Sequence, residues 1–263
     1  MLRALWTAAS GMKVQQVNLD VIANNIANVN TTAFKASTAN FEDLMYQNLR
    51  LQGTKTEQGN QVPTGILIGL GARLASVEKQ FSQGDTQQTG NQLDLAIEGN
   101  GFLQIQLPSG EVAYTRAGSF QTDSEGRICT SDGYLLDPSI TIPQNAMSVT
   151  VATDGTVSVQ VPNQTALQQV GTLQLWTFPN LGGLNAIGQN LYQVTDASGA
   201  GVSGSAGQNG FGTFLQGYLE TSNVNVMQEM INLIIGQRAY EANSKAIQAA
   251  DQMLQMANNV RQG

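Results

Sequence analysis

The chain has 263 residues, a net charge of −7 with only 12% charged residues, no histidine and one cysteine, Cys129. Without a block of Lys and Arg, this acidic chain is a poor candidate for binding nucleic acid or anionic membranes. Because His is absent and a single Cys forms neither a disulfide nor a thiolate cage, we expect no metal, no cofactor and no catalytic centre of the usual kinds.

Apolar residues at the start of the chain recur at alternating spacings of three and four, which predicts a helix over residues 1–28 with a coiled-coil seam. Val14, Val17, Val21 and Ile22 lie off that seam, so the apolar surface is wider than one partner helix requires. The seam consists of Leu2, Leu5, Ala9, Met12, Gln16, Leu19, Ala23 and Ile26.

Asparagines crowd the end of this helix, in "DVIANNIANVNTTAFK". Asn28, Asn30 and the following threonines suit a helix end, because their side chains bond to nearby backbone. Asn24 and Asn25 come before the end and lie beside seam positions, where amides can bond to an adjacent subunit without burying charge. Helix capping and subunit contact both remain open for this pair.

Residues 29–70 are predicted to form a linker and an extended arm. The segment "ANFEDLMYQNLR" has a short helical pattern that carries Glu42 and Asp43, and the polar stretch 48–65 follows it. Loops of this length inside compact domains are uncommon and are usually functional or disordered. We interpret the stretch as an arm that lies on a neighbouring subunit.

Residues 71–225 change to a period of two and are predicted to form a β-rich outer domain. The segment "LDLAIEGNGFLQIQL" alternates, and Gly126, Gly133 and Gly155 each mark a turn between short strands. The run "SVTVATDGTVSVQV" is typical of a β-hairpin. The expected fold is therefore α+β, with a central all-β domain between two terminal helices.

Residues 226–263 are predicted to form the last helix, which carries two apolar stripes. Two stripes need two partners, of which the first helix can be only one. Gly236 lies inside this helix and marks a bend, a close contact or a tolerated glycine. One stripe consists of Val226, Met230, Leu233, Tyr240, Ile247 and Leu254, and the other of Ala239, Ala246, Ala250, Met253, Ala257 and Val260.

Catalytic motifs are missing from the sequence. The acidic pairs Glu42 with Asp43 and Asp94 with Glu98 are interpreted as solvated side chains, the second pair on the outer face of a strand. No nucleophile elbow, metal-ligand spacing or calcium loop occurs. We expect no enzymatic activity.

The motifs "ALWTAASGM", "LDLAIEGNGFLQI" and "QRAYEANSKAIQAADQML", with the asparagine-rich segment above, resemble the flagellar rod and hook family of axial proteins. The resemblance covers nearly the whole chain. The single short β-domain, "FEDLMYQNLR" with its polar arm, and "TSNVNV" indicate a subunit from the distal part of the rod. A hook member would carry an additional β-domain, and a proximal rod member would usually lack such an arm.

The resemblance implies a structural subunit that self-assembles into a straight, hollow helical filament, with the terminal helices lining the channel. It implies torque transmission, type III export in place of a cleaved signal, and a location in the periplasm from the peptidoglycan to the outer membrane. The implied partners are further copies, proximal rod subunits, hook or hook-junction subunits, and the periplasmic and outer-membrane rings.

We therefore expect subunit contacts on both terminal helices and a stiffening role for the arm. Ala33 stands where the family often has Gly, which argues against a positive φ there, and Gly236 stands where a helix former is more usual. The expected contacts are Leu5, Met12, Leu19, Asn24, Asn25, Ile26, Met230, Leu233, Tyr240, Ile247 and Leu254, and the arm residues are Thr54, Glu57, Gln61 and Pro63.

Two other classes of protein remain as alternatives. A secreted β-rich module that binds glycans from a coiled-coil stalk would need exposed aromatic side chains on its sheet, and only 6% of the chain is aromatic. A hydrolase acting on the cell wall would need a catalytic pair. Both alternatives are less consistent with the sequence than a structural subunit.

Overall fold

The computed structural model describes residues 2–52, 64–162 and 166–262, and its fold is α+β. The chain divides into two compact units. Unit 1 comprises Met1–Ala27, Ser37–Lys79 and Asn225–Gly263, and unit 2 comprises Asn28–Ala36 and Gln80–Val224. These limits differ from the predicted ones, since residues 28–36 join the β-rich unit and residues 37–79 join the helices.

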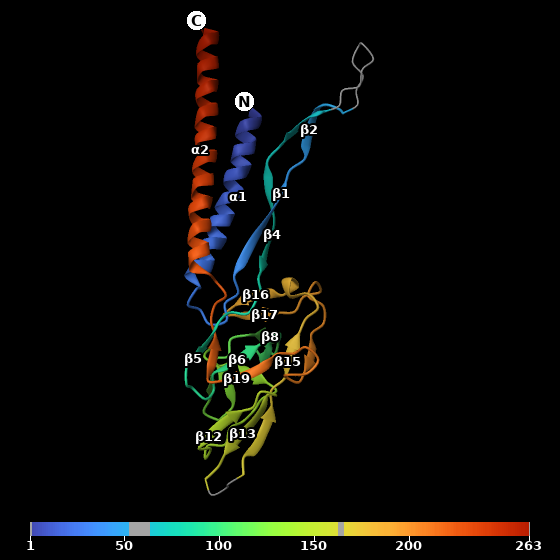
Figure 1. Cartoon of the computed structure of the whole chain (residues 1–263), viewed down its shortest axis with the longest axis vertical. Helices are drawn as coiled ribbons and strands as arrows, with labels where there is room; N and C mark the ends of the chain where they lie inside the picture. Colours follow the sequence, from blue (N-terminus) through green and yellow to red (C-terminus); the bar gives the residue numbers. More distant parts are fainter. Residues whose placement is uncertain (1, 53–63, 163–165, 263) are drawn as a thin grey trace. The chain divides into compact units, whose positions relative to one another are not determined.

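Unit 1 contains the two helices, α1 (Leu2–Ala27) and α2 (Val226–Gln262), which pack against each other. They run antiparallel, so that both chain ends lie at the same end of the pair (Figure 1). Close approaches follow this direction: Gly11 meets Asn243 and Gly236 meets Leu19. The pairing of the terminal helices is therefore observed within one chain.

Local side chains define the ends of both helices. After α1, the hydroxyl of Thr31 donates to Asn28 Oδ1 at 3.1 Å, as expected for a polar helix end. Before α2, Asn225 Oδ1 accepts from the backbone N–H of Gln228 at 3.2 Å and so acts as an N-cap. Glu229 in the first turn adds a negative charge where the helix dipole favours it.

Residues 37–52 and 64–79 contain two antiparallel ribbons, and α1 lies between α2 and the ribbon of β1 (Ser37–Asp43) and β4 (Ala72–Lys79) (Figure 1). Strand β1 pairs with β4, and β2 (Tyr46–Arg50) pairs with β3 (Ile66–Gly69). The short helical pattern predicted around Glu42 is wrong. Its apolar residues fit either period, and pairing with β4, including a Glu42–Arg73 ion pair at 2.8 Å, decides for strand.

Unit 2 is a set of antiparallel sheets. Its largest sheet has seven strands in the order β16-β17-β8-β7-β11-β10-β9, and β12-β13-β14 form a second. The described part of unit 2 also contains three two-stranded sheets, β15-β18, β19-β6 and β20-β5.

The strand bounds in unit 2 are as follows: β5 (Thr86–Gln88), β6 (Leu95–Glu98), β7 (Leu103–Gln106), β8 (Val112–Thr115), β9 (Phe120–Thr122), β10 (Ile128–Thr130), β11 (Leu135–Asp137), β12 (Ser148–Val151), β13 (Thr156–Gln160), β14 (Gln168–Thr172), β15 (Leu175–Thr177), β16 (Asn185–Gly188), β17 (Leu191–Gln193), β18 (Val202–Gly204), β19 (Thr213–Gln216) and β20 (Tyr218–Glu220). A 3-10 turn, η1 (Leu181–Gly183), precedes β16.

The predicted turns are confirmed. Gly126, Gly133 and Gly155 have φ values of 81°, 84° and 87°, and each connects two neighbouring strands. In the last of these hairpins Val149 faces Val159 and Val151 faces Val157, which is the pairing that the alternating valines require.

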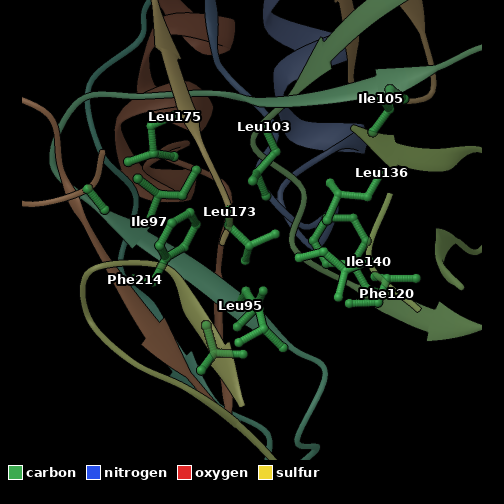
Figure 2. Close-up of a cluster of buried hydrophobic side chains, with 14 of the residues drawn as sticks. Leu95, Ile97, Leu103, Ile105, Phe120, Leu136, Ile140, Leu173, Leu175 and Phe214 are labelled. Carbon is green, nitrogen blue, oxygen red and sulfur yellow. The ribbon is translucent and has the colours of Figure 1, made fainter. Parts of the chain in front are cut away.

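The core of unit 2 lies between its sheets, and Figure 2 shows its side chains converging from strands distant in sequence. Leu95, Leu103 and Phe214 are almost fully buried in it. Asp94, expected to be solvated, is in fact buried at the edge of this region. Its carboxylate accepts hydrogen bonds from Thr89 (2.6 Å) and Asn91 (3.1 Å), which compensate for the lost hydration.

Ala33 adopts a left-handed backbone with φ of 55°, so the expectation drawn from its Cβ is wrong. The residue is buried, and its N–H donates to the carbonyl of Glu220 at 2.8 Å. Neighbouring backbone bonds in this segment fix the conformation although a Cβ disfavours it.

Candidate assembly surface

The apolar surface of α1 is divided between its own unit and solvent. Its buried residues are Ala8, Val14, Ile22 and Asn25. The predicted seam residues Leu5, Met12, Leu19 and Ile26 are instead half-buried. Val14 and Ile22, which lie off the predicted seam, are therefore part of the contact within the chain. The seam residues keep part of their apolar area exposed.

Helix α2 exposes more apolar surface than α1 does. Among the predicted contacts, Met230 and Tyr240 are exposed, whereas Leu233, Ile247 and Leu254 are half-buried. The prediction missed four larger contributors. These are Met227, Ile231, Ile234 and Ile235, which together with Met230 have exposed fractions between 49% and 71%.

We call these five residues the α2 stripe: Met227, Met230, Ile231, Ile234 and Ile235. Their spacing of three and four places them on one side of the first turns of α2. Gly236 is buried on the other side, where a Cβ would lie 3.0 Å from Leu19 Cδ2. The stripe thus faces away from α1, and Gly236 marks a close helix contact in an unbroken helix.

The two asparagines before the end of α1 have different roles. Asn25 is buried, and its Oδ1 accepts from the N–H of Ser37 at 2.9 Å while its Nδ2 donates to the carbonyl of the same residue at 2.9 Å. A further bond joins Asn25 Nδ2 to Glu229 at 3.3 Å. Asn25 therefore joins α1, β1 and α2 of its own unit, a role that the sequence analysis did not foresee. Asn24 is exposed, and its subunit contact stays a prediction.

The β2–β3 ribbon also exposes apolar side chains. Every residue of β2 is exposed, and Met45, Leu51 and Leu67 are at least half exposed. An isolated two-stranded ribbon is only marginally stable in water. The predicted linker and arm thus contain the strands β1, β2 and β3. The arm residues Thr54, Glu57, Gln61 and Pro63 lie outside the described residues.

Unit 2 contains a buried ionic cluster that sequence reasoning missed. Glu220 lies between two cations: its Oε1 is 2.6 Å from Lys35 Nζ, and its Oε2 is 2.9 Å from Arg116 Nε. All three side chains are at most 4% exposed. Lys35 ends the asparagine-rich segment quoted above, and Glu220 directly precedes "TSNVNV", but a single sequence does not reveal that these two residues meet Arg116.

The electrostatics of this cluster favour the carboxylate. Burial acts to raise the pKa of Glu220, but the charges of Arg116 and Lys35, with hydrogen bonds from Lys35 and the Gly84 N–H, hold it below its usual value. Burial lowers the pKa of Lys35, opposed by Glu220. The bonds of Glu220 to Lys35 and Arg116 are those of a buried structural ion pair.

The described residues meet neither the requirements of a membrane-spanning helix nor those of a metal site. Neither α1 nor α2 has a stretch long and apolar enough to pass through a membrane. Within residues 2–52, 64–162 and 166–262, His, Cys, Asp and Glu side chains do not gather in groups of three or more that could hold a metal ion.

The paired terminal helices, the exposed aliphatic stripe and the β-rich unit that lies between the helices in sequence define a class of α+β proteins with an apolar face suited to protein–protein contact. Comparison with known families agrees with this class. Residues 5–35 match the flagella basal body rod protein family, 96–159 the flagellar hook protein FlgE/F/G D1 domain, and 215–260 the flagellar basal body rod FlgEFG protein C-terminal family.

Several relatives match this chain over nearly its whole length. The flagellar basal-body rod protein FlgG of Caulobacter vibrioides is 51% identical over 99% of this chain and 100% of its own. FlgG of Buchnera aphidicola subsp. Schizaphis graminum is 49% identical over 97% and 98%, and FlgG of Borreliella burgdorferi 46% over 99% of each. The chain belongs to the flagellar basal-body rod protein family, whose members are structural components of the basal body.

Proposed function

We propose that this chain is the structural subunit of the distal flagellar rod and that many copies assemble into a straight, hollow helical filament. The proposal is supported by the family assignment together with the α2 stripe. A contact that does not close into a ring generates a helical filament, and the stripe offers an apolar face that the described chain leaves exposed.

The rest of the proposed mechanism is mechanical. The helices of unit 1 form an inner coiled-coil layer around a channel through which later subunits are exported, and unit 2 forms an outer layer. Torque passes through many contacts between amide-rich surfaces of low charge, which pack with little desolvation of ions. Family membership favours this function over a glycan-binding module or a hydrolase.

The proposed location and partners follow from the same assignment. The subunits leave the cytoplasm through the flagellar type III system and assemble in the periplasm, across the peptidoglycan toward the outer membrane. Each copy contacts other copies, and the filament contacts the proximal rod, the hook or its junction, and the periplasmic and outer-membrane rings.

The α2 stripe provides the direct test of assembly. Ile234→Glu places a charge in the stripe and should prevent the formation of straight tubes by concentrated protein in electron microscopy. Gln237→Glu adds the same charge to an exposed polar position of the same helix and should leave assembly unchanged. Tubes of normal yield from Ile234→Glu would exclude the stripe as an assembly contact.

The proposed stiffening arm has its own test. Deletion of residues 54–63 should give curved or unstable polymers, because the arm would no longer lie on a neighbouring subunit. Curvature and persistence of the polymers are measured in the same images. Tubes that remain straight and equally stiff after the deletion would refute the role of the arm and leave the role of the stripe intact.

A further inference from the structure

Three segments of unit 2 adjoin the points where the chain passes between the two units. Residues 28–36 follow α1, residues 80–85 follow β4, and residues 218–224 precede α2. Within unit 2 these segments are bonded to one another, although up to about 190 positions separate them in sequence. The bonds converge on two side chains, Glu220 and Asn223.

Glu220 connects all three segments through its carboxylate. Oε1 accepts from Lys35 Nζ at 2.6 Å and from the Gly84 N–H at 2.9 Å. The second oxygen accepts from Arg116 Nε at 2.9 Å, and Arg116 in turn donates to the carbonyls of Ile97, Gly99 and Gly101. Through Arg116, which follows β8, the carboxylate therefore also links the three segments to β6 and to the loop between β6 and β7.

Asn223 forms a second junction beside the first. Its Oδ1 accepts from the Ala36 N–H at 2.7 Å, and its Nδ2 donates to the carbonyls of Gln80 (2.8 Å) and Ser82 (3.1 Å). The backbone adds bonds from the Ala33 N–H to the Glu220 carbonyl (2.8 Å) and from the Asn223 N–H to the Phe34 carbonyl (3.3 Å). The early and late segments are thus bonded in both directions.

Residues 80–85 and 218–224 also pack very closely against each other. A Cβ on Gly84 would lie 2.1 Å from the carbonyl oxygen of Thr221, so these two segments approach as closely as a glycine allows. The Thr221 N–H donates to the carbonyl of Asp85 at 2.8 Å. Removal of one segment would deprive buried polar groups of the other two of some of their partners.

We propose that Glu220 is a latch that makes the docking of residues 28–36 and of residues 218–224 onto unit 2 a single cooperative event. Lys35 and Arg116 cannot be buried at low energy without the carboxylate, and the carboxylate cannot be buried without them. Before residues 218–224 have docked, residues 28–36 therefore have no favourable site on unit 2. The two segments dock onto unit 2 together.

Amide hydrogen exchange in the full-length protein tests the latch. Glu220→Gln removes the charge and keeps the shape, and it should accelerate exchange at Ala33, Ala36, Thr221 and Asn223 by roughly 100-fold or more. Amides in β7 and β11 should change by only a few-fold. Glu111→Gln, an exposed carboxylate of the same unit, is the matched control and should change none of these amides.

A second variant, Lys35→Gln, tests the cooperativity, and it replaces Glu220→Gln if that variant does not fold. Lys35→Gln weakens the cluster from the early segment and leaves Glu220 paired with Arg116. It should accelerate exchange at Thr221 and Asn223 as much as at Ala33 and Ala36. Acceleration confined to the early segment would overturn the latch, and so would parallel acceleration in β7 and β11, which would indicate only a loss of global stability.

Discussion

Ala33 carries strain that its neighbours compensate. A residue with a Cβ in the left-handed region costs about 1–2 kcal/mol. Ala33 is held there because its N–H bonds to the Glu220 carbonyl and because the surrounding segment is buried. The position therefore tolerates small side chains only.

Two substitutions at Ala33 should separate strain from packing. Ala33→Gly relieves the backbone strain but loses one buried methyl group, worth ~0.8 kcal/mol. The free energy of unfolding of this variant should therefore remain within about 1 kcal/mol of the wild-type value. Ala33→Val adds a β-branched side chain at a buried left-handed position and should cost more than ~2 kcal/mol. Urea unfolding followed by the fluorescence of Trp176 measures both, and equal stability of the two variants would contradict the strain.

Glu220 should make the stability of unit 2 depend on pH in the acid range. Its pKa in the folded state is below that of an ordinary Glu, about 4.3 in the unfolded chain. The stabilisation is thus fully present above that value and is lost as the pH falls through the folded pKa.

The comparison with Glu220→Gln isolates this effect from other carboxylates. The wild type should be the more stable protein at pH 7, and the difference in free energy of unfolding should shrink steadily below about pH 4.3. Urea unfolding at pH values from 7 to 3 gives the difference directly. A difference that stays constant over this range would show that the Glu220 charge does not contribute.

At the scale of elements, the sequence predicted both helices and the β character of the centre. Strict spacing over long segments identified α1 and α2, and glycines in turns identified the hairpins of unit 2. The failure at Glu42 has a physical reason: a short apolar pattern fits a helix or a strand, and long-range pairing with β4 decides between them. Likewise, spacing alone did not show which face of α1 its own unit covers.

Gly236 determines how closely α1 and α2 approach. Gly236→Val should push Leu19 away, because a Cβ already lies 3.0 Å from its Cδ2, and should destabilise the helix pair by about 1–3 kcal/mol. Val is a better helix former than Gly, so helix propensity does not account for a loss at this position. Ala242→Val introduces the same side chain at an exposed position of the same helix and should cost only about 0.5 kcal/mol. Thermal unfolding of the assembled tubes, followed by circular dichroism at 222 nm, compares the two variants, and equal losses would argue against the close contact.

At the scale of the whole molecule, exposed apolar surface lies mainly in unit 1. Among the described residues, the α2 stripe and the β2–β3 ribbon carry apolar side chains that are largely exposed. A helix gains most of its stability from packing of its apolar face. We therefore expect assembly to stabilise these elements, since copies of the chain would cover them.

Exchange rates before and after assembly should show this stabilisation. In dilute monomer the amides of residues 2–27 should exchange rapidly, and in assembled tubes they should be protected, while those in the core of unit 2 should be protected in both. Hydrogen exchange detected by mass spectrometry distinguishes the two regions in both states. Full protection of residues 2–27 in the dilute monomer would mean that one chain suffices to stabilise its own helices.

The amino-acid sequence by itself determined the α+β class, the two long helices, the main hairpins and, through its motifs, the family. These features depend on local spacing and on turn residues, which are readable along the chain. Only the tertiary structure decided that residues 37–50 are strand, that Asn25 is used inside its own unit, and that Lys35, Arg116 and Glu220 meet. Each of these depends on segments far apart in sequence, whose proximity is created by burial and pairing and leaves no local pattern.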